Sequence, residues 1–183
     1  MIKISDRSFF RQDAVSLAKS LLGKILIVKG NKTIKKCRIA ETEAYGGITD
    51  KAAHSYNNRR TARTEVMYRD GGCIYIYLIY GIHYLLNIVA NVIDVPEAVL
   101  IRAVKPLENF KGELNGPGKL TKWLNIDKTY NGIDLAASDE ISLIDDGYRI
   151  SKIAAAKRIN IDYAGADKDR LWRFYINDDR SAE

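Results

Sequence analysis

Apolar side chains recur with helical spacing near the start of the chain. They occupy positions 14, 15, 17, 18, 21 and 22, directly after Asp13. Aspartate is a preferred N-cap because its carboxylate accepts from free backbone amides, and a glycine such as Gly23 commonly ends a helix. The sequence therefore predicts a short amphipathic helix over residues 14–22.

A β-hairpin is predicted to follow. Residues 24–29 (KILIVK) are an apolar run of strand length, Gly30-Asn31 offers a reverse turn, and residues 33–45 resume an extended pattern. The Gly46-Gly47 pair ends this second strand.

Side chains alternate between the two faces of a strand, which groups polar residues in this second strand. Ile39, Glu41, Glu43 and Tyr45 are spaced by two positions and are expected to share one face. A carboxylate and an aromatic ring would then project side by side.

Residues 48–72 carry few apolar side chains, which predicts a long surface loop that contains one short helix.

The second half of the chain reads as short strands with tight connections. Strands are predicted for residues 73–78, 83–91, 99–104 and 171–176. The first two form a hairpin with Tyr80 near its tip. Helical structure is predicted for residues 119–124, after the Asn-Gly-Pro-Gly break, and for an alanine-rich turn within 150–158.

These elements mix helices with short strands, and short links suit antiparallel pairing. With 183 residues, 46% of them hydrophobic, the chain can bury a substantial core. We expect one domain over residues 1–183, with 177–183 as a frayed polar tail.

Charge and cysteine content narrow the class of protein. The chain has 29 Lys+Arg against 23 Asp+Glu, a formal charge of +6, which favours a polyanionic partner without proving one. Two cysteines, Cys37 and Cys73, cannot build a cysteine zinc site, so no metal is expected. Apolar runs are too short to cross a bilayer. We expect a soluble cytoplasmic protein, nucleoid-associated if prokaryotic.

The stretch from residue 41 to 87 concentrates the candidate chemistry. Glu43, with Tyr45 and His54 nearby in the chain, is a candidate general base that takes a proton from water. The competing interpretation is a solvated glutamate on an exposed strand, which is the commoner case for an isolated carboxylate.

Tyrosines in this stretch allow two interpretations. Tyr45, Tyr75, Tyr77 and Tyr80 could stack on nucleobases, or they could fill a core. The core interpretation suits Tyr75 best. An aromatic side chain at a turn, such as Tyr80, suits wedging between base pairs.

Other polar residues allow either a structural or a functional interpretation. Arg59, Arg60 and Arg63, with Arg69, could contact phosphates or simply form a solvated basic face. Asn87 and Arg102 fall in apolar strands, where each needs a hydrogen-bond partner or a task in a site.

The Gly116-Pro117-Gly118 turn before a helix could bind DNA phosphates in the manner of a helix-hairpin-helix loop. A helix leading into this turn is poorly supported by the sequence.

Ordered motifs across the chain resemble the alkyladenine (3-methyladenine) DNA glycosylase family, from about residue 9 to 176. They are ETEAY (41–45), AAHS (52–55), YIYLIYGIHYLLNI (75–88), IRAVKPLE (101–108), GPGKL (116–120) and RFY (173–175). One segment departs from the resemblance, since Asn160-Ile161-Asp162 stands where the family is rich in glycine and valine.

The resemblance implies an α+β fold: a single mixed domain with a curved antiparallel sheet, short helices and a protruding hairpin that inserts into DNA. It implies a monofunctional DNA glycosylase of base excision repair that flips alkylated or deaminated purines out of double-stranded DNA. The bond to the base is hydrolysed by an activated water, which leaves an abasic site. Expected substrates are 3-methyladenine, hypoxanthine and ethenoadenine; no cofactor is expected, and the protein is expected to be a monomer.

Residue roles carry over position by position. Glu43 would deprotonate the attacking water, which Arg102 and the backbone carbonyl of Ile159 would hold. Tyr80 would fill the space that the flipped nucleotide leaves. The base pocket would be formed by Tyr45, His54, Tyr77 and Asn87, with Asn87 excluding the 2-amino group of guanine. The DNA backbone would be contacted by Arg59, Arg60, Arg63 and Lys119.

Two alternatives stay open. A non-catalytic nucleic-acid binding module could use the same aromatic and basic surface without breaking any bond. A helix-hairpin-helix glycosylase would rest on the Gly-Pro-Gly turn and would make Glu43 dispensable.

Overall fold

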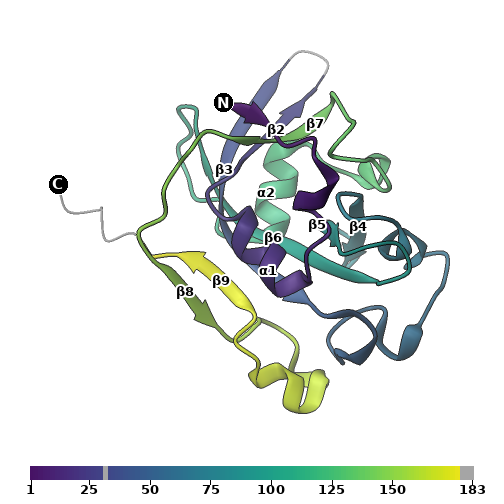
Figure 1. The fold of residues 1–183 in the computed structure, drawn as a ribbon. Coiled ribbons are helices and arrows are strands. Elements are labelled where there is room, and N and C mark those ends of the chain that lie inside the picture. The colour runs from purple at the N-terminus through teal and green to yellow at the C-terminus, as the bar shows by residue number, and fades with distance from the viewer. Residues whose placement is uncertain (31–32, 178–183) are drawn as a thin grey trace.

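The computed structural model describes residues 1–30 and 33–177, and in these residues nine strands form one sheet. Neighbouring strands are antiparallel in the order β1-β7-β2-β3-β6-β5-β4, while β9 pairs with both β3 and β8. The strands are β1 (Ile2–Lys3), β2 (Ile25–Lys29), β3 (Ile34–Tyr45), β4 (Ile74–Ile79), β5 (His83–Ala90), β6 (Glu97–Pro106), β7 (Ile141–Asp145), β8 (Ile153–Ala156) and β9 (Arg173–Ile176). The predicted α+β class is confirmed (Figure 1).

Helical structure is short and supports the sheet. Helix α1 (Ala14–Leu21) begins as predicted, because the Asp13 carboxylate accepts from the amides of Val15 and Ser16, each at 3.0 Å. Helix α2 (Pro117–Leu124) follows Gly116. The remaining helical segments of the described chain are 3₁₀ turns: Arg7–Phe9, Gly47–Thr49, Tyr56–Asn58, Glu65–Tyr68, Lys128–Tyr130 and Asp162–Asp169.

Residues 107–116, between β6 and α2, contain no helix. A helix-hairpin-helix loop needs a helix on both sides of its glycine turn. The structure therefore removes the alternative that rested on Gly116-Pro117-Gly118.

The main core lies on the face of the sheet that α1 covers. Leu17 and Leu21 of α1 pack in one buried cluster with Leu120 and Leu124 of α2 and with side chains from the central strands. On β3 the Thr42 hydroxyl donates to the Ala18 carbonyl at 2.9 Å, so Thr42 points toward α1. Glu43, the next residue, therefore points to the opposite face.

Ile39 was expected to share a face with Glu43, and this is wrong. Ile39 is fully buried in the main core together with Ala44. The β3–β6 register shifts between Ile39 and Glu41 and again between Glu41 and Thr42, which marks a bulge. A bulge inserts an extra residue, so the alternation of faces changes at that point. Glu43 and Tyr45 keep their predicted shared face.

Two other predictions need correction. The alanine-rich segment expected to be helical within 150–158 contains β8, where Ala154 pairs with Tyr175 of β9. Alanine has the highest intrinsic helix propensity, but propensity is a small energy per residue, and pairing with a neighbouring strand overrides it here. The segment 48–72 was expected to be a surface loop, but it contains three 3₁₀ turns and its side chains Val66, Met67 and Tyr68 are buried.

Strand β7 was not predicted from the sequence. It pairs with β1 and β2.

The β4–β5 hairpin protrudes as expected, with Tyr80 at its tip and 77% exposed. Tyr80 and Gly81 both have positive φ, 53° and 71°, as in a type I′ turn, and the Ile82 amide donates to the Ile79 carbonyl at 3.2 Å. A bulky residue at positive φ is strained, which singles out this tip as a candidate functional feature.

Two predictions fall at the limits of the described residues. The Gly30-Asn31 turn includes Asn31, which lies outside them, as does the tail from 178 onward. The Asn177 amide donates to the Lys152 carbonyl at 3.0 Å, which extends the β8–β9 pairing by one residue.

Candidate active site

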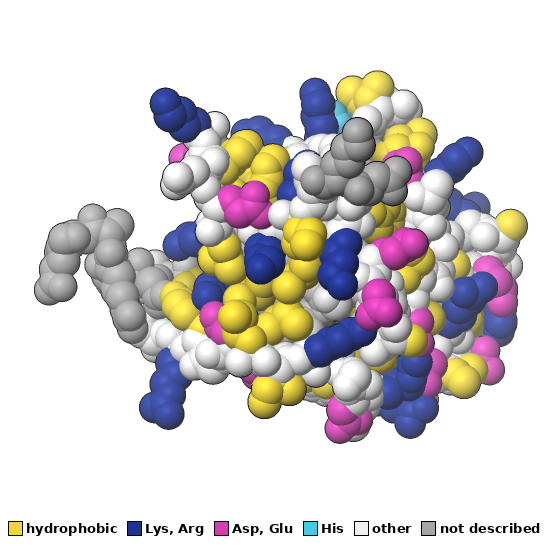
Figure 2. Space-filling model, turned by 90° about the horizontal axis from the view of Figure 1, so that it is seen from above, with side chains coloured by type: hydrophobic (Ala, Val, Ile, Leu, Met, Phe, Trp, Pro, Cys, Tyr) yellow, Lys and Arg dark blue, Asp and Glu magenta, His cyan; other side chains and the backbone are white. Residues whose placement is uncertain are grey.

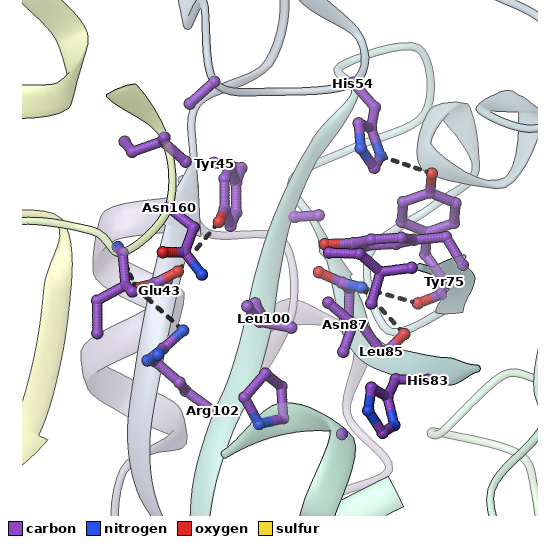
Figure 3. Close-up of a pocket in the computed structure, with 18 of the residues that line it drawn as sticks. Glu43, Tyr45, His54, Tyr75, His83, Leu85, Asn87, Leu100, Arg102 and Asn160 are labelled. Carbon is purple, nitrogen blue, oxygen red and sulfur yellow. Dashed lines mark hydrogen bonds and ion pairs between the residues drawn. The ribbon is translucent and has the colours of Figure 1, made fainter. Parts of the chain in front are cut away.

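A cavity of about 640 Å³ opens on the face of the sheet opposite α1. Strands β3 to β6 line it, together with the start of α2 and residues 159–163. Figure 3 shows Glu43 and Tyr45 on one side and His54, Tyr75 and Asn87 on the other. The cavity brings together the predicted site residues other than Arg59 and Arg60: Glu43, Tyr45, His54, Arg63, Tyr77, Tyr80, Asn87, Arg102, Lys119 and Ile159.

Glu43 is fully buried, and both of its carboxylate oxygens are held in place. Oε1 accepts from the backbone amide of Ile159 at 2.9 Å, and Oε2 accepts from the Tyr45 hydroxyl at 3.0 Å. The guanidinium of Arg102 lies 3.6 Å from Oε1, beyond hydrogen-bond distance but close enough to neutralise charge. The predicted proximity of Glu43 and Tyr45 is confirmed.

Burial raises the pKa of Glu43 above its ordinary value of 4.5, because a charged carboxylate loses hydration in the cavity wall. The positive charge of Arg102, the Ile159 amide, the Tyr45 hydroxyl and the charge of Arg173 all oppose this rise. These contacts stabilise the carboxylate form, which is the form that accepts a proton from water.

Arg102 is oriented by a second carboxylate that we did not single out from the sequence. Glu41 Oε1 lies 3.2 Å from Arg102 Nε and 2.9 Å from Arg173 Nη1. Glu41 thus anchors one edge of the Arg102 guanidinium, leaving Nη1 directed to Glu43. The ETEAY spacing, two carboxylates two positions apart on one strand face, was a usable signal for this pair.

The far wall is aromatic. His54 Nδ1 lies 2.9 Å from the Tyr75 hydroxyl, and the His54 and Tyr77 rings meet edge to face with centroids 4.6 Å apart. Tyr75, expected to be a core residue, is buried and also orients His54. Burial lowers the pKa of His54 from 6.5 to about 4, assisted by the charges of Arg63 and Arg59, so His54 is neutral at neutral pH.

Asn87 is 3% exposed and its amide nitrogen is fixed. Nδ2 donates to the backbone carbonyls of Tyr75 at 3.1 Å and Leu85 at 3.3 Å, as Figure 3 shows. The side chain therefore has little freedom to move away from a ligand in the cavity.

A buried ion pair that sequence reasoning missed supports the Glu43 wall. Arg158 and Asp50 are both fully buried, with Arg158 Nη2 2.9 Å from Asp50 Oδ1. Arg158 also donates to the Ala44 carbonyl at 2.9 Å, and its guanidinium lies 5.1 Å from both the Tyr45 and Trp172 ring centroids. This clamp fixes the backbone that carries Ile159. The two partners are 108 positions apart, so no local pattern indicated the pair.

The predicted DNA-contacting cations are in different environments. Arg63 lies 5.4 Å from the Tyr77 ring centroid and also lines a neighbouring cleft with Arg59 and Lys51. Arg60 lies outside both cavities and pairs with Glu65 and Asp94. On the face drawn in Figure 2, coloured lysine and arginine side chains are scattered among acidic and hydrophobic ones.

Among the described residues, no three His, Cys, Asp or Glu side chains come close enough together to bind a metal ion. Cys37 and Cys73 are both buried free thiols, and burial raises the pKa of Cys37 to about 12.

Of the helices in the described ranges, none is both long and apolar enough to span a membrane.

The geometry as a whole suits one kind of reaction. A buried, partly neutralised carboxylate lines a cavity whose walls also carry tyrosine and histidine rings, an arrangement suited to activating a water against a bound aromatic ligand.

Comparison with known proteins agrees with this arrangement. The family model described as methylpurine-DNA glycosylase matches residues 8–180. A protein of Clostridium novyi (strain NT) is 48% identical over 199 residues, covering 98% of each chain. A protein of Natranaerobius thermophilus is 51% identical, covering 94% of this chain and 95% of its own, and one of Borreliella burgdorferi is 51% identical with 96% and 97% covered. Each carries the provisional name 3-methyladenine DNA glycosylase.

Proposed function

Because the chain belongs to the methylpurine-DNA glycosylase family, we propose that it flips alkylated or deaminated purine nucleotides out of double-stranded DNA and hydrolyses the bond between base and sugar. The observation that carries the proposal is the fully buried Glu43 carboxylate, held by Ile159 and Tyr45 at the wall of an aromatic cavity. The enzyme acts in base excision repair in the cytoplasm, at the nucleoid in a prokaryotic cell.

Glu43 serves as the general base. It takes a proton from a water molecule, the water oxygen forms a bond to the anomeric carbon, and the bond from that carbon to the base nitrogen breaks. The electron pair of the broken bond leaves with the base, and the products are free base and an abasic site. Arg102 and the Ile159 carbonyl hold the water. No lysine Schiff base enters the scheme, so strand cleavage is not expected.

The damaged base is recognised by shape and stacking. Tyr45 lies on one side of the flipped purine, and His54 and Tyr77 lie on the other. These rings stack on the base because every purine presents a π-face. Asn87, held by two backbone carbonyls, excludes the 2-amino group of guanine. The substrates proposed are 3-methyladenine, hypoxanthine and ethenoadenine.

The hairpin and the neighbouring cations bind the duplex. Tyr80 enters the minor groove and fills the vacated position in the base stack. Phosphates are contacted by Arg59, Arg60, Arg63 and Lys119. A single copy of the chain supplies all of these groups, so we propose a monomer.

The proposal is tested with duplexes that carry one hypoxanthine or one ethenoadenine, and with alkylated DNA that releases 3-methyladenine. Wild type and Glu43→Gln are incubated with each, and alkali then cleaves the duplexes at abasic sites. Excision by wild type and its loss in Glu43→Gln, with lesion binding retained, is the expected result.

Glu97→Gln is the matched control, because Glu97 is a half-buried glutamate on β6 that accepts from the Ala14 amide, away from the cavity. Its excision rate is expected to equal that of wild type. Tight binding with no release of any of the three bases would instead favour the non-catalytic binding module. Full activity in Glu43→Gln would overturn the role given to Glu43.

A further inference from the structure

The outer half of the β4–β5 hairpin has few contacts with the rest of the sheet. Residues 77–79 pair with residues 83–85 and with no other strand of the described chain. The side chains at positions 78, 80, 82 and 83 are exposed, and within the described residues none of them makes a hydrogen bond or an ion pair. A hairpin of two strands alone is marginally stable in water, so a support outside the hairpin is needed to hold Tyr80 in one direction.

Helix α2 provides that support. The buried Thr121 hydroxyl donates to the Tyr84 carbonyl at 2.7 Å. One turn earlier on the same face of the helix, Gly118 packs against His83, which pairs with Ile79 next to the hairpin turn. The helix is a fixed base for both contacts, because its leucines are buried in the main core.

The fit between His83 and α2 leaves no room for a side chain at position 118. A Cβ atom built on Gly118 would lie 2.9 Å from His83 Cγ and 3.2 Å from His83 Cβ, whereas carbon atoms in good contact are about 3.5–4.0 Å apart. Both atoms are at the base of the histidine side chain, so a turn of the imidazole ring in its own plane does not relieve the overlap.

Glycine is not required at position 118 for its backbone conformation. Gly118 lies inside α2 and does not have a positive φ, and alanine is preferred to glycine within a helix. The missing side chain therefore serves the close contact with His83. This contact also explains part of the Gly-Pro-Gly motif, which the reaction scheme does not use.

We propose that Gly118 and His83 are positioning residues that brace the hairpin against α2 and so set the direction in which Tyr80 enters DNA, an inference that rests on the function proposed above. Figure 3 shows His83 on the same side of the cavity as Asn87, so the brace lies along the wall from which the hairpin extends. The same helix carries Lys119, a proposed phosphate contact. The wedge and this cation thus keep a fixed spacing.

Gly118→Ala tests the brace because the added methyl group displaces His83. In single-turnover excision from a hypoxanthine duplex, the rate is expected to fall roughly tenfold, within the cost of losing one stacked ring. The double variant Gly118→Ala/His83→Ala is expected to recover much of this loss, since a small side chain at position 83 makes room for the methyl group. A defect that acted through Lys119 would not be recovered in this way.

The Tyr80→Gly background gives a readout that a merely structural role would not move. With no ring left to direct, Gly118→Ala is expected to cause no further loss there, which is the coupling expected of residues that act as one unit. His83→Ala alone approaches the brace from its exposed side. It is expected to slow duplex excision less than Gly118→Ala does, and again only when Tyr80 is present.

Gly30→Ala is the matched control. Gly30 follows β2, outside the cavity, and a Cβ atom built on it meets only Thr33, at 3.4 Å or more. Its excision rate is expected to equal that of wild type.

The outcomes separate the brace from the proposed function. If wild type releases none of the three lesion bases, the proposed function fails, whatever Gly118 does. If wild type is active and both Gly118→Ala and His83→Ala keep the full rate, the brace is overturned. An undiminished effect of Gly118→Ala in the Tyr80→Gly background, or no recovery in the double variant, would overturn it as well.

Discussion

The backbone amide of Ile159 donates to Glu43 Oε1 at 2.9 Å, although 116 positions separate the two residues. The contact joins the segment after β8 to the C-terminal end of β3, and it gives the buried carboxylate a second neutral donor besides the Tyr45 hydroxyl. Together with Arg102 and Tyr45, this amide lets Glu43 carry charge where burial disfavours it.

Excision is expected to fall as pH is lowered through the pKa of Glu43, because protonated Glu43 cannot accept a proton from water. Burial raises that pKa, so the midpoint of the acid limb should lie above the ordinary value of 4.5. In Arg102→Gln the midpoint should move higher still, since the largest opposing charge is gone. Single-turnover rates measured across pH check both statements. A midpoint below 4.5, or one that Arg102→Gln lowers, would contradict them.

Asp50→Asn is expected to lower the free energy of unfolding by about 3–5 kcal/mol, because it leaves the buried charge of Arg158 without a counterion. Asp94→Asn is the matched control. It breaks an exposed pair with Arg60 and should change stability by less than about 1 kcal/mol. Urea unfolding of the three proteins gives the comparison. Equal losses in the two variants would show that the Asp50–Arg158 pair does not stabilise the fold through burial.

His54 is expected to make the fold sensitive to acid. Its pKa is lowered from 6.5 to about 4, so between these values the unfolded chain binds a proton that the folded chain does not. This contribution to stability is complete above pH 6.5 and is lost as pH falls toward 4. Thermal unfolding at pH 7 and pH 5 should show a larger drop in Tm for wild type than for His54→Gln.

His83→Gln serves as the control for this measurement, because His83 is exposed at the start of β5. It should show the wild-type drop in Tm. If His54→Gln shows the same drop as well, the acid sensitivity comes from other groups.

Tyr80→Gly is expected to separate stability from activity. Relief of the positive φ at Tyr80 and the greater freedom of glycine in the unfolded chain oppose each other, so stability should stay within about 1 kcal/mol. Excision from a duplex should fall roughly tenfold, since loss of one stacked ring costs ~1–3 kcal/mol. Excision from a single strand should be unaffected, because no base stack is left to fill. An equal loss on both substrates would point to a pocket defect instead.

Local patterns predicted much of the scaffold and part of the site. The Asp13 cap, the hairpin with Tyr80 at its tip, and the shared face of Glu43 and Tyr45 depend on residues close together in the chain. Period, capping and turn chemistry act over a few residues, so they can be read from sequence. The alanine-rich strand β8 was missed because its conformation comes from pairing with β9 rather than from its own preference.

The sequence by itself determined which residue types were present and which neighbours shared a strand face. Only the tertiary structure decided that Ile39 turns into the core while Glu43 faces the cavity, because the β3–β6 bulge depends on register between two strands. Only it brought Arg158 to Asp50 and the Ile159 amide to Glu43. Burial and ion pairing between distant segments have no local signature, since their energies arise when the chain closes around them.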